Sequence, residues 1–80
     1  MNFVNALSRQ HTVRTIAITD MLLLKRIHSD LYTYDGFEFV AREGTPAVNG
    51  YVVVKGNHPP EYFNPARFNA SYALALDTSN

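Results

Sequence analysis

The chain has 80 residues, of which 46% are hydrophobic and 18% charged, a composition that favours one packed α+β domain spanning residues 1–80 and argues against disorder. Seven lysines and arginines balance seven aspartates and glutamates, so the chain lacks the basic excess of a general polyanion binder. The absence of cysteine excludes disulfides and thiolate zinc sites, and the lack of an apolar run of membrane-spanning length predicts a soluble, cytoplasmic protein.

Two elements are predicted before residue 19. Residues 2–9 are expected to form a short helix, because Asn2 is a good N-terminal cap and Phe3 and Leu7 lie four residues apart on one face. Residues 11–18 are rich in β-branched side chains and predict a strand. Both faces of this strand are largely apolar, so we expect it in the interior of a sheet.

Residues 20–32 are predicted to form the main helix. Thr19 supplies a capping oxygen, and Asp20 in the first turn suits the positive end of the helix dipole. Four apolar residues fall within one arc of about 100° on a helical projection: Leu23, Leu24, Ile27 and Leu31. Asp35-Gly36 then signals a turn that ends this helical region.

Two further strands are predicted in the middle of the chain. Residues 37–42 place two phenylalanines on one face, and residues 51–55 form a β-branched run that begins after Asn49-Gly50. We expect these two strands to pair directly as a hairpin across the loop 43–50.

The C-terminal part begins with a proline-rich connection and continues as a short helix. Asn64-Pro65 combines an N-cap residue with the residue favoured at the first helical position, which predicts a helix over 65–69. Residues 70–77 fit a strand, from the alternation of apolar residues, or a continuation of the helix, from the abundance of alanine. We favour the strand.

Together these elements predict an α+β fold in which a short N-terminal helix precedes the order β-α-β-β-α-β. That order is ferredoxin-like: an antiparallel sheet of three to four strands with helices on one face. The alternative is an α+β fold with a three-stranded sheet and a longer C-terminal helix.

Strong catalytic and nucleotide-binding motifs are absent from the sequence. The three histidines, His11, His28 and His58, come from separate elements, which argues against a metal site. His58, Glu61, Tyr62 and Arg67 are candidates for an acid-base set, but His58 precedes two prolines that hold it extended, and Glu61 is more simply a solvated loop acid. We therefore expect no enzymatic activity, no catalytic residue, no metal and no cofactor.

The segment 55–69 favours protein binding. Tyrosine and arginine are common in interface hot spots, and proline reduces the entropy lost when a loop becomes ordered. Acidic residues nearby are expected to contact a basic surface on the partner. The predicted partner-binding residues are Glu61, Tyr62, Phe63, Arg67, Glu38 and Glu43. An equally good interpretation of the aromatic residues, with Phe68, is a small core cluster beneath the loop.

A short, neutral chain without cysteine or motifs is typical of accessory proteins of phages and mobile elements. We therefore expect a non-enzymatic inhibitor of a host enzyme or of a bacterial defence complex, in the manner of anti-CRISPR proteins, acting in the host cytoplasm.

The alternative prediction is a nucleic-acid-binding module. Residues 1–27 carry four basic side chains against one acidic side chain, an excess that residues 28–80 cancel. The nucleic-acid-binding candidates are Arg9, Arg14, Lys25 and Arg26. A homo-oligomer is also open, since strand 11–18 or 51–55 could pair across a two-fold axis if it lies at a sheet edge.

Overall fold

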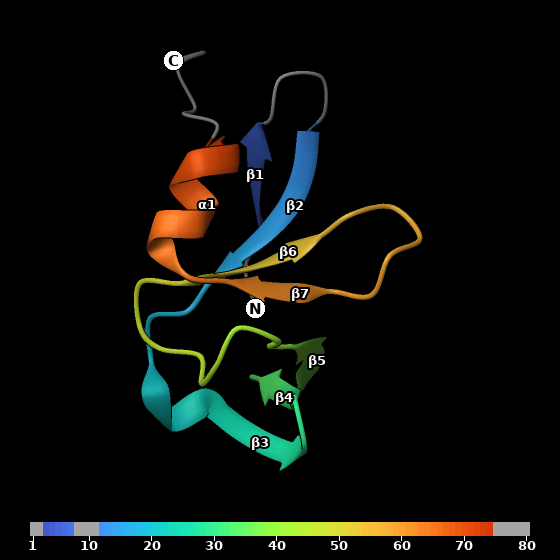
Figure 1. Ribbon diagram of the computed structural model, residues 1–80, viewed down its shortest axis with the longest axis vertical. Helices are drawn as coiled ribbons and strands as arrows, with labels where there is room; N and C mark the ends of the chain where they lie inside the picture. The colour runs from blue at the N-terminus through green and yellow to red at the C-terminus, as the bar shows by residue number, and fades with distance from the viewer. Residues whose placement is uncertain (1–2, 8–11, 75–80) are drawn as a thin grey trace.

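The computed structural model describes residues 3–7 and 12–74 of the chain (Figure 1). Strands account for 47% of these residues. Within them, no helix has the length and apolar composition needed to cross a membrane. The elements of the described chain are β1 (Val4–Leu7), β2 (Thr12–Ala17), the 3₁₀ turn η1 (Met21–Leu23), β3 (Leu24–His28), β4 (Leu31–Tyr34), β5 (Phe37–Val40), β6 (Tyr51–Val54), β7 (Glu61–Phe63), α1 (Pro65–Ser71) and β8 (Ala73–Leu74).

The eight strands in this part of the chain form one mixed sheet in the order β3-β4-β5-β7-β6-β2-β1-β8. All neighbouring strands are antiparallel except β5 and β7, which are parallel. Figure 1 shows β3, β4 and β5 at one end of the molecule and β1, β2 and α1 at the other, with β6 and β7 between them.

Strand β7 lies between β5 and β6, so the predicted direct pairing of 37–42 with 51–55 is wrong. The strand contains two consecutive aromatic residues, Tyr62 and Phe63, which point to opposite faces of the sheet and are both buried. A strand with apolar side chains on both faces is favoured where the sheet is covered on both sides. The two aromatic rings therefore account for the interior position of β7.

Each face of the sheet has its own hydrophobic core. The buried residues of the first core are Ile16, Ile18, Tyr34, Phe39, Ala41, Val52 and Tyr62. The buried residues of the second core are Ala6, Val13, Val53, Phe63 and Phe68. Phe68 comes from α1 and stacks on Tyr51 with 4.0 Å between the ring centroids. Helix α1 therefore covers the second core.

The predicted helix over residues 20–32 is wrong, because this segment forms η1, strand β3, a turn and the start of β4. The two-residue turn between β3 and β4 is Ser29-Asp30, and Ser29 has a φ of 51°, which is incompatible with an α-helix. Asp35-Gly36 is a second two-residue turn, between β4 and β5, with φ values of 53° and 83°. Positive φ at both positions is typical of a type I′ hairpin turn, so the residues on either side pair as strands.

The hydroxyl of Tyr34 holds the loop between β2 and η1. It accepts hydrogen bonds from the backbone N–H groups of Thr19 and Asp20, each at 3.0 Å. Burial raises the pKa of Tyr34, but its hydrogen bonds with Thr19 and Asp20 together lower it by more, so the pKa lies below its ordinary value. Asp20 caps η1 by accepting a hydrogen bond from the Leu22 amide at 2.9 Å, in place of the predicted cap Thr19. These contacts fix the point at which β3 begins.

The predicted N-terminal helix over residues 2–9 is also wrong, because β1 forms there and pairs with β2. The strand predicted over 11–18 is confirmed as β2, and its position between β1 and β6 confirms that it is an interior strand. Strand β6, predicted over 51–55, is interior as well. Neither strand therefore offers the free edge expected for self-association.

Helix α1 confirms the helix predicted at Pro65. Asn64 is its N-cap, and the Asn64 Oδ1 atom accepts a hydrogen bond from the Arg67 amide at 2.8 Å. The strand predicted over 70–77 is confirmed only at residues 73–74, which form β8. It is wrong at residues 70–71, which belong to α1, and residues 75–77 lie outside the described residues.

The predicted ferredoxin-like α+β fold, with an antiparallel sheet of three to four strands and helices on one face, is therefore wrong. The described chain is mostly strand, forms an eight-stranded mixed sheet and has one short α-helix. The longer C-terminal helix of the alternative fold does not form either, because α1 ends at Ser71. The main cause of the error is that segments with helical spacing of apolar residues form strands instead.

Thr15 provides a test of the second core, because it pairs with Val53 across the β2–β6 ladder. Its side chain is fully buried, and its Oγ1 atom has no hydrogen-bond partner within the described residues. We predict that Thr15→Val raises the free energy of unfolding by about 1 kcal/mol, because a buried unpaired hydroxyl is replaced by a methyl group. Urea denaturation measures the change.

Thr12→Val is the matched control, since Thr12 is exposed on the same strand. It should change the free energy of unfolding by less than about 0.5 kcal/mol. A loss of stability in Thr15→Val would show that the buried hydroxyl contributes to the fold.

Candidate functional site

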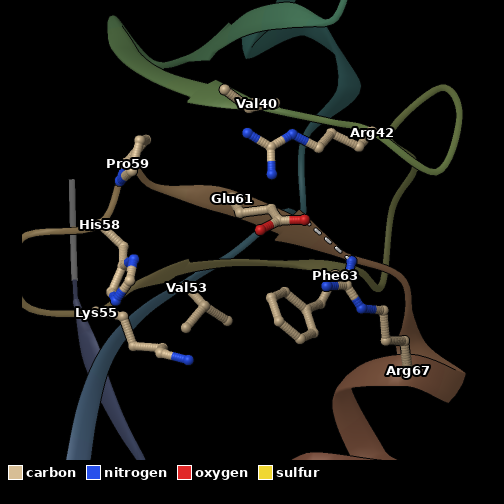
Figure 2. A pocket seen from close by; sticks show the side chains of 9 residues that line it. All are labelled: Val40, Arg42, Val53, Lys55, His58, Pro59, Glu61, Phe63 and Arg67. Atoms are coloured by element: carbon tan, nitrogen blue, oxygen red, sulfur yellow. Dashed lines mark hydrogen bonds and ion pairs between the residues drawn. The ribbon is translucent and has the colours of Figure 1, made fainter.

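A cavity of about 270 Å³ lies beside the parallel junction of β5 and β7 (Figure 2). This junction is short: the ladder contains one residue pair, Val40 with Glu61, and the Val40 amide donates to the Pro60 carbonyl at 2.9 Å. The side chains that line the cavity are those of Val40, Arg42, Val53, Lys55, His58, Pro59, Glu61, Phe63 and Arg67. They come from β5, β6, β7, α1 and the loops that follow β5 and β6.

Arg67 is fixed on one side of the cavity by two carboxylates. Its Nη1 atom donates to Glu43 Oε2 and to Glu61 Oε2, the latter at 3.3 Å. Its guanidinium carbon lies 3.8 Å from the centroid of the Phe63 ring, a cation–π contact. The hydrogen bond with Glu43 raises the pKa of Arg67, burial lowers it, and Glu61 raises it further, so the pKa lies above its ordinary value. Arg67 is therefore a fixed cation.

Glu43 connects the loop after β5 to the start of α1. Its Oε1 atom accepts hydrogen bonds from the backbone N–H of Asn64 at 3.3 Å and from the Asn64 side-chain amide. Because Asn64 also caps α1, one carboxylate and one amide set the position of Arg67. Glu43 is an exposed residue, but its carboxylate is already engaged by Asn64 and Arg67.

Three other basic side chains at the cavity have no such partner. The side chains of Arg42, Lys55 and His58 make no hydrogen bond or ion pair with the described residues, and all three residues are exposed. Figure 2 shows Glu61 between Arg42 and Arg67, with Lys55 and His58 on another side of the cavity. The cavity and the adjacent Glu43 carry one net positive charge when histidine is neutral. The three positive side chains are Arg42, Lys55 and Arg67, and the two negative ones are Glu43 and Glu61.

The structure brings together four of the six predicted partner-binding residues. Glu61, Phe63 and Arg67 line the cavity, and Glu43 binds Arg67 beside it. Glu38 is exposed on β5 and does not line the cavity.

The predicted aromatic contacts belong to the core. Tyr62 is 3% exposed, and its hydroxyl accepts a hydrogen bond from the Ala47 amide at 3.2 Å. Phe63 and Phe68 are buried in the second core. Of the two interpretations of the aromatic cluster, the structure therefore supports the core cluster.

The predicted nucleic-acid-binding residues do not form one group. Lys25 and Arg26 are neighbours on β3, whereas Arg14 lies on β2, and four strands separate β3 from β2 in the sheet order. The Arg14 guanidinium stacks over the Phe3 ring, 4.3 Å from its centroid. Arg9 lies outside the described residues.

His58 and Glu61 both line the cavity, but no hydrogen bond joins them, and Glu61 binds Arg67 instead. No group of three or more histidine and carboxylate side chains capable of holding a metal ion occurs within residues 3–7 and 12–74. The cavity therefore combines basic side chains with an apolar wall.

The sequence interpretation missed Arg42 and Lys55. A signal for both was present, because side chains two residues apart in a strand share a face, and these residues follow Val40 and Val53 at that spacing. This spacing alone does not show that Arg42 and Lys55 lie at one cavity, because their meeting depends on β7, which lies between β5 and β6.

Gly50 tests how tightly Tyr62 is packed, because a Cβ atom added at Gly50 would overlap the end of the Tyr62 ring. We predict that Gly50→Ala lowers the free energy of unfolding by about 1–3 kcal/mol, since the buried ring must shift. In a Tyr62→Leu background the same substitution should cost less than about 0.5 kcal/mol, which a double-mutant cycle by urea denaturation measures. Equal costs in the two backgrounds would contradict a direct clash.

No family model, curated protein or solved structure matches the chain.

Proposed function

We propose that this chain is a small protein-binding domain whose partner pairs an extended segment with strand β3. The observation that carries the proposal is the exposed apolar segment formed by η1 and β3. Leu22 is 83% exposed, and the other exposed apolar side chains of the segment are those of Met21, Leu23 and Ile27. Four of the eight exposed large apolar side chains found among the described residues lie in η1 and β3. Such clusters are typical of protein interaction sites.

Strand β3 also has an unpaired edge. It is the first strand in the sheet order and pairs only with β4 among the described residues. The backbone N–H and C=O groups on its other edge are free to form a ladder with an added strand. Strand addition of this kind combines backbone hydrogen bonds with side-chain contacts, and here the apolar residues would provide the latter.

The charge of β3 favours an acidic partner. Lys25, Arg26 and His28 lie on the strand, and no acidic residue does. Two copies of the chain could also pair through β3, but like charges would then meet. Antiparallel pairing centred on Arg26 places Arg26 opposite the Arg26 of the other copy, and pairing centred on the Lys25–Arg26 bond places Lys25 opposite Arg26. Like charges directly opposite each other destabilise a strand pair. A partner segment that alternates acidic and apolar side chains meets both the charges and the apolar surface.

The identity of the partner rests on a different argument. The proposed partner is a host enzyme or a bacterial defence complex, which this domain would inhibit by binding. Only the small size and motif-poor composition of the chain support this identity. Non-enzymatic inhibition is consistent with a binding edge, because an inhibitor needs only to occupy a surface of its target.

A short capped peptide that alternates glutamate and valine tests the binding edge. We predict that it protects the amides of residues 24–28 from hydrogen exchange in wild-type protein, whereas a lysine–valine peptide does not. The variant Leu22→Ser plus Ile27→Thr should bind the acidic peptide about tenfold more weakly, equivalent to about 1.4 kcal/mol. Because both residues are exposed, each substitution should change stability by less than about 0.5 kcal/mol.

Val48→Thr is the matched control, since Val48 is 39% exposed but lies in the loop between β5 and β6. It should bind the acidic peptide as wild type does. Equal protection by both peptides, or a dimer that dissociates in the Leu22→Ser plus Ile27→Thr variant, would contradict an acidic partner. Binding of a single-stranded oligonucleotide that weakens with salt, in place of the peptide, would favour the nucleic-acid alternative.

A further inference from the structure

We propose that the cavity beside Val40 and Glu61 binds a small organic anion: a carboxylate or phosphate group carried on an apolar body. This site is independent of the proposed function, because the cavity is formed by β5, β6, β7 and α1 and includes no residue of β3.

The size and walls of the cavity define the apolar part of the ligand. A volume of about 270 Å³ is roughly nine times the share of one water molecule in the liquid, enough for a ring or a short branched chain. Val40, Val53, Pro59 and Phe63 form apolar walls. A free inorganic ion would leave these walls in contact with water, whereas an apolar group would cover them.

The cations define the charged part. The side chains of Arg42 and Lys55 enter the cavity from two different loops and have no carboxylate partner within the described residues. Arg67 binds Glu43 and Glu61 through Nη1, so its Nε and Nη2 N–H groups make no hydrogen bond with the described protein. An anion between these side chains would gain charge-assisted hydrogen bonds.

Glu61 sets the selectivity of the site. Its carboxylate lies among the cations, and the contact with Arg67 offsets part of its charge. Glu61 still repels an incoming anion, so loss of its charge should strengthen binding, unlike loss of the charge of Arg42 or Lys55.

Four probes separate the two parts of the ligand in an NMR titration that follows the backbone amides. Phenyl phosphate and 3-phenylpropionate carry both an anionic group and a ring, benzyl alcohol carries a ring alone, and inorganic phosphate carries charge alone. We expect the first two to shift the amides of residues 53–63 and the other two to bind at least about fivefold more weakly. The tighter of the first two identifies phosphate or carboxylate as the preferred group.

Variants locate the binding at the cavity. Arg42→Gln and Lys55→Gln should each weaken binding of the tighter probe about fivefold, and Glu61→Gln should strengthen it by a similar factor. Lys25→Gln, on exposed β3, is the matched control and should leave the affinity unchanged. Arg42 and Lys55 have no partner to lose, so these two variants keep the fold and decide the result even if Glu61→Gln unfolds.

Three results would overturn the proposal. Benzyl alcohol binding as tightly as phenyl phosphate would remove the anionic requirement, and inorganic phosphate binding as tightly would remove the apolar one. Weakening by Lys25→Gln equal to that by Arg42→Gln and Lys55→Gln would show that only general charge is involved.

Discussion

The structure depends on the insertion of the three-residue strand β7 between β5 and β6. Its consecutive aromatic residues project to opposite faces, Tyr62 into the first core and Phe63 into the second. Because one strand supplies a large side chain to each core, neither core is complete without it. Gly50 allows the Tyr62 ring to approach the backbone closely, and Phe68 on α1 closes the second core above Phe63. The same strand connects the β3-β4-β5 part of the sheet to the rest.

The parallel junction made by β7 also explains where the cavity lies. Strands β5 and β7 share one residue pair, and the cavity is lined by side chains on both sides of that pair. Antiparallel neighbours in this sheet share longer ladders, with four pairs between β4 and β5. A short ladder leaves space beside it that only side chains can fill, and here those side chains are long and charged. The mixed topology and the candidate site thus have one origin.

Local sequence patterns correctly predicted β2, β6 and α1, because their residues favour a single structure. The β-branched residues of β2 and β6 favour a strand, and Asn64-Pro65 favours the start of a helix. Residues 20–32 failed because their apolar residues satisfy a helical arc, while Ser29-Asp30 and Asp35-Gly36 close two-residue turns that require strands on both sides. The Asp-Gly signal was visible but was interpreted as the end of a helix. The adjacent aromatic residues of β7 favour an interior strand, but no local pattern shows that its neighbours are β5 and β6, because that depends on distant segments.

Local sequence patterns also do not predict which charged side chains of the candidate site pair with each other. The sequence predicted Glu43, Glu61 and Arg67 as separate contacts for a partner, but in the fold both glutamates bind Arg67. Asp20 is likewise engaged, as the cap of η1. Which charges remain available is decided by which oppositely charged side chains the sheet brings into contact, and a neutral composition contains no information about this. In this fold the pairing leaves basic side chains at both open surfaces, Arg42 and Lys55 at the cavity and Lys25 with Arg26 on β3. A chain with equal numbers of acidic and basic residues can therefore present basic side chains at two separate surfaces.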